Sequence, residues 1–224
     1  MFAVSQSLQT FTSGGKDIRL DCFIPRGADG QRFPAVISLH GSGGGHATMS
    51  QPAEQLASQG FAVYVLHYFD RTDTSYADKT TIFRHFPVWM KTLWDAISVV
   101  ERQPVVNSEQ IALLGFSLGA YLALSDAAID SRIKAVVEFF GGLPKEMKLF
   151  MRRLCPVLIL HGQADPTVPV EEAYHLQRVL EKKGIPYEIQ IYPEAGHGFT
   201  GETWQDAGRR SLAFLKRYLT PAAA

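Results

Sequence analysis

The sequence lacks an excess of charge of either sign, because 22 Lys and Arg residues stand against 22 Asp and Glu residues. A chain with balanced charge has no electrostatic footprint for nucleic acid or for an anionic membrane surface. It also lacks any apolar run of about 18 residues, the length that a membrane-spanning helix needs. We therefore expect no nucleic-acid partner and no membrane span, and a compact domain that acts on a small molecule.

Cysteine is scarce, since the chain carries only Cys22 and Cys155. The N-terminus also lacks the basic segment and the continuous apolar segment of a signal peptide. Two cysteines without an export signal favour thiols over a disulfide, and so a cytoplasmic location. The His, Cys and acidic residues show no metal-ligand spacing, and we expect neither a metal nor a cofactor.

What the sequence does contain is an alternation of apolar runs and helical patterns. The N-terminal part predicts two strands, at about 3–12 and Ile18–Ile24, joined by a Gly14-Gly15 turn. Six runs rich in apolar residues follow, at Pro34–Leu39, Phe61–Leu66, Ile111–Leu114, Ile133–Phe140, Val157–Leu160 and Tyr187–Tyr192. The segments between and after them predict helices at Pro52–Gln59, Pro87–Arg102, Leu118–Ile129, Val170–Lys183 and Trp204–Leu219.

Continuous apolar runs, rather than alternating ones, indicate strands that are buried on both faces by helices. We therefore expect a three-layer α/β/α sandwich around a mostly parallel, doubly wound sheet. No linker rich in Pro, Gly or Ser divides the chain, so the sequence predicts a single domain over residues 1–224.

A G-x-S-x-G pattern, Gly115 to Gly119, lies between the run Ile111–Leu114 and the helix that follows it. In this setting the chain makes a tight, strained turn that lifts a serine oxygen above the sheet, and only glycine avoids a clash at the flanking positions. The pattern alone is common by chance, but the strand before it and the helix after it make Ser117 a candidate nucleophile.

A serine hydroxyl needs an imidazole base, and the base needs an orienting acid. Asp165 follows the run Val157–Leu160, and His197 follows the run Tyr187–Tyr192, so both belong at carboxyl ends of strands beside Ser117. Glu138, near the end of another strand, is the alternative acid. His40 and His161 each precede a glycine at a strand end, a position typical of histidines that anchor loops rather than of bases.

A tetrahedral intermediate also needs two backbone N–H groups that hold its oxyanion. We expect one from Leu118, the residue after the nucleophile, and the other from Ser42, with Gly43 as the next choice, in the glycine-rich loop His40–His46. This loop lacks the GK[ST] sequence of a phosphate-binding loop, which argues against a nucleotide site.

Together these motifs resemble the α/β-hydrolase superfamily and, within it, the dienelactone hydrolase-like family. The matching stretches are HGSGG, GFSLG, HGQADPTVP and EAGHGF, within about residues 34–200. The resemblance implies an eight-stranded type of sheet, the triad Ser117, Asp165 and His197, and hydrolysis of esters or lactones without a metal. The founding dienelactone hydrolases use a cysteine nucleophile where this chain has Ser117, so the resemblance does not define the substrate.

The segment Gly141–Pro156 is too short for the lid domain that this fold can carry there, so we expect an open cleft covered only by loops. The long segment after Leu66 is the remaining candidate for a wall of this cleft. Substrate contacts are predicted from aromatic and basic residues there and near the nucleophile, namely Phe69, Arg71, Arg84, Phe116, Tyr121 and Phe199. The two arginines could bind a substrate carboxylate or pair with the acids of their own loop.

The sequence thus predicts a serine hydrolase that cleaves a small carboxylic ester or lactone through an acyl-enzyme. A peptidase, a thioesterase or an acyltransferase with the same triad is the first alternative. A non-catalytic receptor for a small ligand is the second, although no member of the triad is missing. The pattern does not decide between a monomer and a homodimer.

Overall fold

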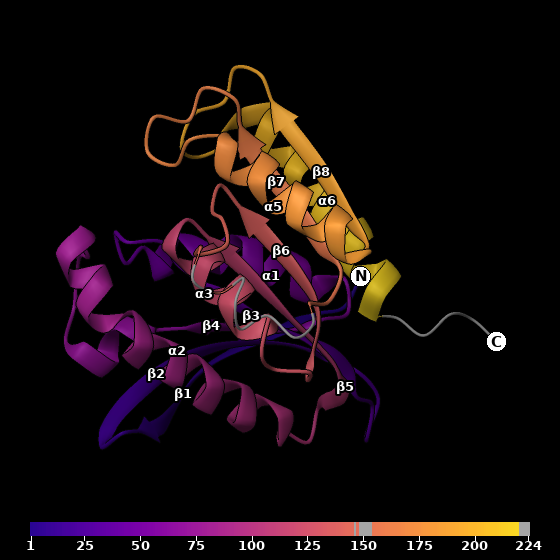
Figure 1. Ribbon diagram of the computed structural model, residues 1–224. Coiled ribbons are helices and arrows are strands. Elements are labelled where there is room, and N and C mark those ends of the chain that lie inside the picture. Colours follow the sequence, from indigo (N-terminus) through magenta and orange to yellow (C-terminus); the bar gives the residue numbers. More distant parts are fainter. Residues whose placement is uncertain (146, 148–153, 220–224) are drawn as a thin grey trace. The chain divides into compact units, whose positions relative to one another are not determined.

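A computed structural model describes residues 1–145, 147 and 154–219 of the chain (Figure 1). Its strands form an eight-stranded sheet in the order β1-β2-β4-β3-β5-β6-β7-β8. The sheet is mostly parallel and carries helices, as the sequence predicts. The chain divides into two compact units, Met1–Ile111 and Ala112–Ala224, each of which is described by itself below. The single domain stays a prediction.

The first unit begins with the antiparallel hairpin of β1 (Val4–Ser13) and β2 (Lys16–Pro25), whose two-residue turn is Gly14-Gly15. Strand β4 (Ala62–Leu66) pairs antiparallel with β2 and parallel with β3 (Phe33–Leu39). All five residues of β4 are buried, as its continuous apolar run predicts.

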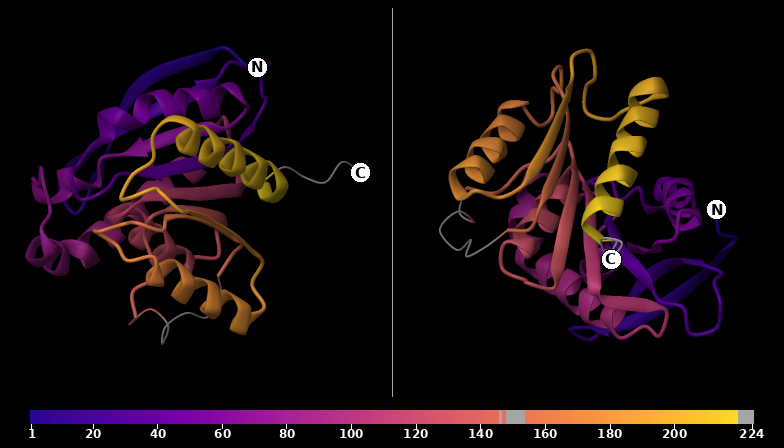
Figure 2. Two further views of the ribbon diagram at one scale, coloured as in Figure 1. Left: turned by 90° about the horizontal axis from the view of Figure 1, so that it is seen from above. Right: turned by 90° about the vertical axis from the view of Figure 1, so that its right-hand side faces the viewer.

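Two helices cover this part of the sheet. Helices α1 (Ser50–Ser58) and α2 (Lys79–Glu101) lie on opposite faces of these strands (Figure 2). Two short 3₁₀ helices, η1 (His46–Met49) and η2 (Tyr68–Thr72), follow β3 and β4. The unit therefore has the helix–sheet–helix layering that the sequence predicts.

The predicted start of α2 is wrong. The sequence places Pro87 in the first turn of a helix Pro87–Arg102, whereas the helix begins at Lys79 and Pro87 lies inside it. The start is fixed by Asp78, whose carboxylate accepts a hydrogen bond from the Thr81 amide at 2.8 Å. Pro87 only removes one donor from the helix, and at this exposed position its ring does not end it.

The second unit contains three parallel strands, β6 (Ile133–Phe139), β7 (Val157–Gly162) and β8 (Tyr187–Tyr192). Strand β5 (Val106–Phe116) contains the boundary between the units, and α3 (Leu118–Ala127) follows it directly. Helices α5 (Glu171–Lys183) and α6 (Gly201–Leu219) lie on opposite faces of β6, β7 and β8 (Figure 2). The loops that leave β5, β7 and β8 therefore start at carboxyl ends of strands.

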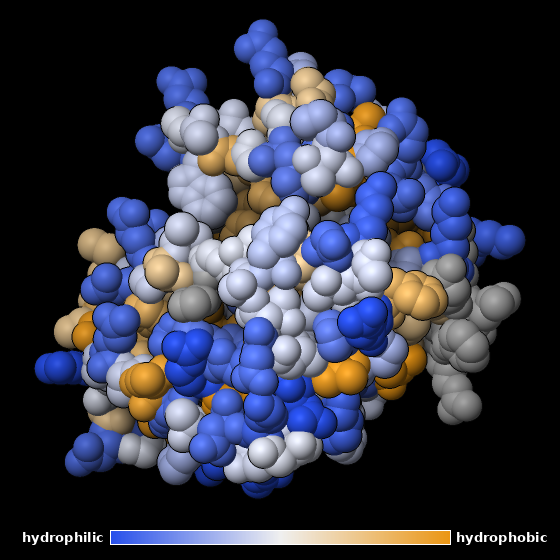
Figure 3. All heavy atoms as spheres, turned by 90° about the vertical axis from the view of Figure 1, so that its left-hand side faces the viewer, coloured by the Kyte–Doolittle hydropathy of each residue, from blue (hydrophilic) through white to orange (hydrophobic). Residues whose placement is uncertain are grey.

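The segment Gly141–Pro156, in which no lid is expected, includes residues 146 and 148–153, which lie outside the described residues. The absence of a lid therefore stays a prediction. Among the helices that are described, none combines the length and the apolar composition needed to cross a membrane. On the face shown in Figure 3, hydrophobic residues lie in small groups separated by hydrophilic ones.

Candidate active site

Ser117 occupies the turn between β5 and α3, with φ 51° and ψ −116°. A positive φ is strained for a residue with a Cβ, and such strain is typical of functional turns. Gly115 makes the turn possible, because a Cβ there would lie 2.3 Å from the Gly119 carbonyl oxygen. The Ser117 amide donates to the Phe139 carbonyl oxygen at 2.9 Å, which ties the turn to the end of β6.

Asp165 lies in the loop after β7, and its side chain is fully buried. Its Oδ1 accepts hydrogen bonds from the backbone amides of Thr167 at 2.8 Å and Val168 at 2.9 Å. Its Oδ2 lies 2.8 Å from His197 Nδ1. The carboxylate is therefore held on both oxygens, with one of them aimed at the imidazole.

His197 lies in the loop after β8, and its Nε2 is 3.0 Å from Ser117 Oγ. The Asp165 carboxylate only accepts hydrogen bonds, so Nδ1 of the neutral imidazole carries the proton and Nε2 is left to accept one. Asp165, His197 and Ser117 thus form one hydrogen-bonded chain. The structure brings together the three residues that the sequence selects.

The loops of Asp165 and His197 are also tied together through their backbones. The Ala164 amide donates to the Ala195 carbonyl oxygen at 3.0 Å. Gly162 permits this approach, since a Cβ there would lie 2.2 Å from the same oxygen. The spacing of the acid and the base is therefore set by main-chain contacts as well as by the side chains.

His161 anchors the Asp165 loop. Its Nε2–H donates to the Val168 carbonyl oxygen at 2.9 Å, and the same nitrogen lies 3.6 Å from Asp165 Oδ2. Burial of the ring lowers the pKa of His161, which favours the neutral form. The sequence predicts an anchoring role for this histidine, and the contact agrees with it.

Glu138, the alternative acid, makes a different contact. It is fully buried on β6, and its Oε2 accepts a hydrogen bond from the Gly141 amide at 2.8 Å. Burial raises the pKa of Glu138 to about 8. The carboxylate that bonds His197 is that of Asp165, whereas the raised pKa of Glu138 favours its neutral form.

An aromatic ring, that of Phe140, contacts His197. The Phe140 ring stands edge-on to the imidazole with centroids 4.9 Å apart, and it contacts Phe199 at 5.2 Å. Phe116, beside the nucleophile, stacks on Phe139 at 4.6 Å. Phe116 and Phe199, two predicted substrate contacts, thus belong to one aromatic cluster. Phe140 carries the contact to the base, and its φ of 42° has no signal in the sequence.

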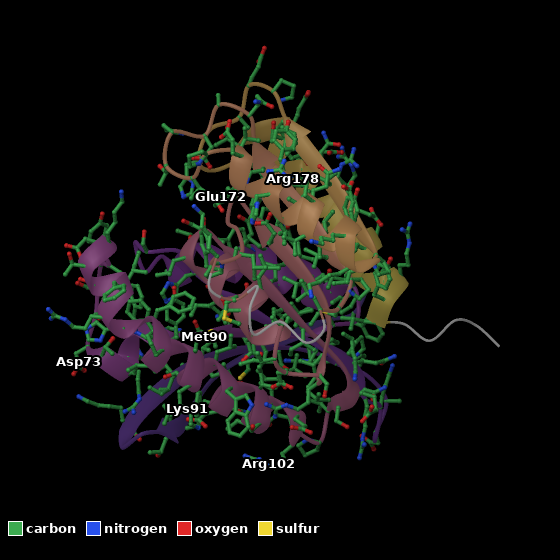
Figure 4. All side chains as sticks on the ribbon, viewed as in Figure 1. Asp73, Met90, Lys91, Arg102, Glu172 and Arg178 are labelled. Carbon is green, nitrogen blue, oxygen red and sulfur yellow. The ribbon has the colours of Figure 1, made fainter. Side chains whose placement is uncertain are left out.

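Tyr121, a third predicted contact, lies one turn after the nucleophile, and its amide donates to the Ser117 carbonyl oxygen at 3.2 Å. Burial raises the pKa of its phenol, and the charge of Glu172 adds to this effect. Glu172 belongs to the first turn of α5 and is labelled in Figure 4. A Cβ added at Gly142 would lie 3.1 Å from the Tyr121 hydroxyl and 3.2 Å from Glu172 Cβ, so both side chains lie beside that glycine.

The predicted oxyanion donors belong to different units. Leu118 is the first residue of α3, directly after the nucleophile. Ser42 lies in the loop after β3 in the first unit, where its carbonyl oxygen accepts a hydrogen bond from the Ala77 amide at 2.9 Å. Gly43 follows it in the same loop.

The other three predicted substrate contacts also belong to the first unit. Phe69 is buried in η2 and packs on Trp89 at 4.7 Å between ring centroids. Arg71 donates from Nη1 to the Gly14 carbonyl oxygen at 2.5 Å. Arg84 is exposed on α2.

The acids near these arginines bind other cations. Asp70 pairs with Arg19 at 2.8 Å, and Asp73 pairs with Lys16 at 2.7 Å. Among the described residues, no group of three or more His, Cys, Asp or Glu side chains is placed to hold a metal ion.

Comparisons with known proteins point to one family. The sequence model of the dienelactone hydrolase family matches residues 21–217 of the chain. A candidate carboxymethylenebutenolidase of Yersinia pestis is 27% identical over 212 residues, which cover 83% of this chain and 79% of that protein. The mitochondrial acyl-coenzyme A thioesterase 2 of Mus musculus is 29% identical over 178 residues, which cover 76% of this chain and 37% of that protein.

A solved structure is similar over the whole fold. The crystal structure of a candidate dienelactone hydrolase from Klebsiella pneumoniae matches with a TM-score of 0.81 and 22% identity, and the match covers 96% of this chain and 100% of that one. At this identity the likeness shows the fold.

Proposed function

The chain belongs to the dienelactone hydrolase family, and on that premise we propose that it cleaves a small carboxylic ester or lactone through an acyl-enzyme on Ser117. Membership makes it a hydrolase of ester bonds. The observation that carries the proposal is the chain of hydrogen bonds from Asp165 through His197 to Ser117, at 2.8 and 3.0 Å. The strained φ of Ser117 is the backbone geometry expected of such a nucleophile.

In the first half of the reaction, Ser117 Oγ attacks the ester carbonyl carbon while His197 Nε2 takes its proton. The tetrahedral intermediate collapses, the bond to the leaving oxygen breaks, and His197 returns the proton to that oxygen. Asp165 keeps the proton of the resting imidazole on Nδ1 and stabilises the imidazolium that forms. The product alcohol of an ester leaves and the acyl group stays on Ser117, whereas the hydroxyl formed from a lactone stays attached to that acyl group.

In the second half, water attacks the acyl-enzyme as His197 Nε2 takes one of its protons. Collapse of the second intermediate releases the carboxylic acid and returns a proton to Ser117 Oγ. The backbone amides of Leu118 and Ser42 are the proposed donors to both oxyanions, because Leu118 directly follows the nucleophile at the start of α3 and Ser42 lies in the loop after β3. No step requires a cofactor.

The test is a Ser117→Ala variant assayed with a short acyl nitrophenyl ester and with a fluorophosphonate probe. The probe forms a bond from phosphorus to Ser117 Oγ and releases fluoride, so it reports the nucleophile directly. We expect hydrolysis to fall by about 10³-fold or more and labelling to vanish. Ser131→Ala, which removes an exposed serine hydroxyl, is the control and should match wild type. Wild-type hydrolysis and labelling by Ser117→Ala would refute the assignment.

A thioesterase is the second candidate, supported by the 29% identity to the acyl-coenzyme A thioesterase. The same nucleophile and base would transfer the acyl group from sulfur instead of oxygen. Matched oxygen esters, thioesters and anilides of one acyl group distinguish an esterase, a thioesterase and a peptidase by their kcat/KM values. The proposed substrate is a small molecule, and the proposed location is the cytoplasm, where the buried thiol of Cys22 would stay reduced.

A further inference from the structure

Glu138 is a buried acid that the proposed mechanism does not use. Its side chain is fully buried, its Oε2 accepts from the Gly141 amide, and its Oε1 has no hydrogen-bond partner among the described residues. A buried acid without a partner for both oxygens costs stability, so its presence requires another contribution. The hydrogen bond to the Gly141 amide indicates what Glu138 contributes.

The hydrogen bond closes a tight turn, Glu138–Gly141, at the end of β6. Phe140 lies in this turn with a φ of 42°, a conformation that a bulky residue keeps only when its surroundings enforce it. A Cβ at Gly141 would lie 2.3 Å from Ala120 Cβ and 3.1 Å from the Ser117 carbonyl oxygen. The turn thus packs directly against Ser117 and the start of α3.

The turn contacts both reacting residues, Ser117 through its backbone and His197 through its ring. The Phe139 carbonyl oxygen accepts the Ser117 amide at 2.9 Å, so the turn holds the backbone of the nucleophile. The Phe140 ring stands edge-on to His197 with centroids 4.9 Å apart, so the turn also limits the positions that the imidazole ring can take. We therefore expect a shift of the turn's backbone to alter the separation of Ser117 Oγ and His197 Nε2.

We propose that Glu138 is a positioning residue, which fixes the turn Glu138–Gly141 through the Gly141 amide and thereby sets the distance between Ser117 and His197. The proposal rests on the proposed function, in which Ser117 is the nucleophile. Glutamine has the same shape and keeps an acceptor oxygen, whereas methionine keeps the length and removes the acceptor.

The experiment compares Glu138→Gln and Glu138→Met with wild type on a nitrophenyl butyrate ester. Values of kcat are given per active site, counted by complete fluorophosphonate labelling, so that misfolded protein does not contribute. We expect Glu138→Met to lower kcat by about 10- to 100-fold, the effect of a displacement of about 1 Å between reacting groups. KM should stay within about 2-fold of wild type, and Glu138→Gln should keep kcat within about 3-fold.

A merely structural role would lower the melting temperature and the number of active sites but leave kcat per site unchanged. The proposal is overturned if Glu138→Met has wild-type kcat per site, or if Glu138→Gln loses as much as Glu138→Met. Should Glu138→Met fail to fold, Glu138→Leu tests the same contact, because it also removes the acceptor of the Gly141 amide with a smaller side chain. Wild-type kcat per site in Glu138→Leu would then overturn the proposal.

Failure of the proposed function gives a different pattern. If Ser117→Ala still hydrolyses the ester and takes the probe, the nucleophile is misassigned. If Ser117→Ala is inactive while Glu138→Met keeps wild-type kcat per site, the nucleophile stands and only the positioning role is lost.

Discussion

His161 Nε2 donates a hydrogen bond to the Val168 carbonyl oxygen at 2.9 Å and so closes the loop that carries Asp165. The amide of Val168 in turn donates to Asp165 Oδ1 at 2.9 Å. One residue of the loop is thus held on its carbonyl by the histidine and on its amide by the acid. The position of the carboxylate beside His197 depends on both contacts.

We therefore expect His161→Leu to leave the Val168 carbonyl unsatisfied and to reduce the free energy of unfolding by about 1–3 kcal/mol. The kcat value should fall as well, because Asp165 loses part of its support. Denaturant unfolding and steady-state kinetics measure the two effects. His161→Gln keeps a donor and should recover part of both, and equal losses in the two variants would argue against this hydrogen bond as the cause.

The assignment of the acid is tested by Asp165→Asn beside Glu138→Gln. An amide at position 165 can donate its own hydrogen to Nδ1, which stabilises the wrong tautomer of His197, and kcat in Ser-His-Asp triads falls by about 10⁴-fold in this case. Glu138→Gln keeps its hydrogen bond to Gly141 and should remain active. An active Asp165→Asn together with an inactive Glu138→Gln would assign the role of the acid to Glu138.

The turn before the nucleophile is tested by Gly115→Ala. A Cβ there would meet the backbone of Gly119 at 2.3 Å, so the turn must shift and Ser117 must move with it. We expect a loss of stability and of fluorophosphonate labelling, both measured on the purified protein. Gly208→Ala in α6 is the matched control, since nothing lies within 4 Å of its Cβ, and it should stabilise the helix by about 0.5–1 kcal/mol.

Much of the fold follows from local patterns in the sequence. Strand β4 is a continuous run of apolar residues, and such a run has few alternatives to a doubly covered strand. Ser117, Asp165 and His197 each follow a predicted strand, so the parallel sheet itself predicts that their loops meet on one edge, although the edge strand β8 before His197 alternates apolar and polar residues. Once these strands are located in the sequence, the candidate triad follows from the residues after them.

The features that the sequence does not reveal depend on contacts between distant residues. The positive φ of Phe140 belongs to a turn that packs against Ala120, and the local sequence has no signal for this contact. Arg71 donates to Gly14 at the β1–β2 hairpin instead of pairing with the acids of its own loop. The start of α2 does have a local signal, the Asp78 cap, which the prominent Pro87 obscured.

Asp126, a buried residue of α3, makes the free energy of unfolding depend on pH. Burial raises its pKa to about 8, and the charge of Asp130 adds to the shift while Arg132 opposes it. In the unfolded chain the pKa of an Asp is about 3.9. Between about pH 4 and pH 8 the folded protein therefore holds a proton that the unfolded chain has lost, and the free energy of unfolding falls as the pH rises through this window.

Asp126→Asn removes this titration. Relative to the variant, wild type should lose a few kcal/mol of unfolding free energy between pH 5 and pH 8, an order-of-magnitude figure from the size of the shift. Glu138 also titrates near pH 8, but it is present in both proteins and cancels in the difference. Denaturant unfolding at several pH values measures the difference, and a constant difference between the two proteins would contradict the buried protonated state of Asp126.

Recognition of an anionic substrate distinguishes the two arginines that the sequence selects. Arg71 is held by the Gly14 carbonyl, and its guanidinium fills the space where a Cβ of Gly14 would lie. Arg84 is exposed on α2, so its charge is the one accessible to a ligand. For a pair of esters that differ only in a carboxylate, we expect Arg84→Ala to lower the ratio of kcat/KM values (anionic over neutral) by about 5- to 10-fold, the magnitude of one charge-assisted contact.

Arg71→Ala should instead lower the melting temperature and leave this ratio unchanged, because the lost contact supports the hairpin. Lys79→Ala is the matched control for Arg84→Ala, since it removes another exposed positive charge from the start of the same helix. An equal fall with Lys79→Ala would mean that the whole helix end attracts anions through its charge. An unchanged ratio with Arg84→Ala would exclude Arg84 as the carboxylate contact, and a neutral ester or lactone would then be the better substrate class.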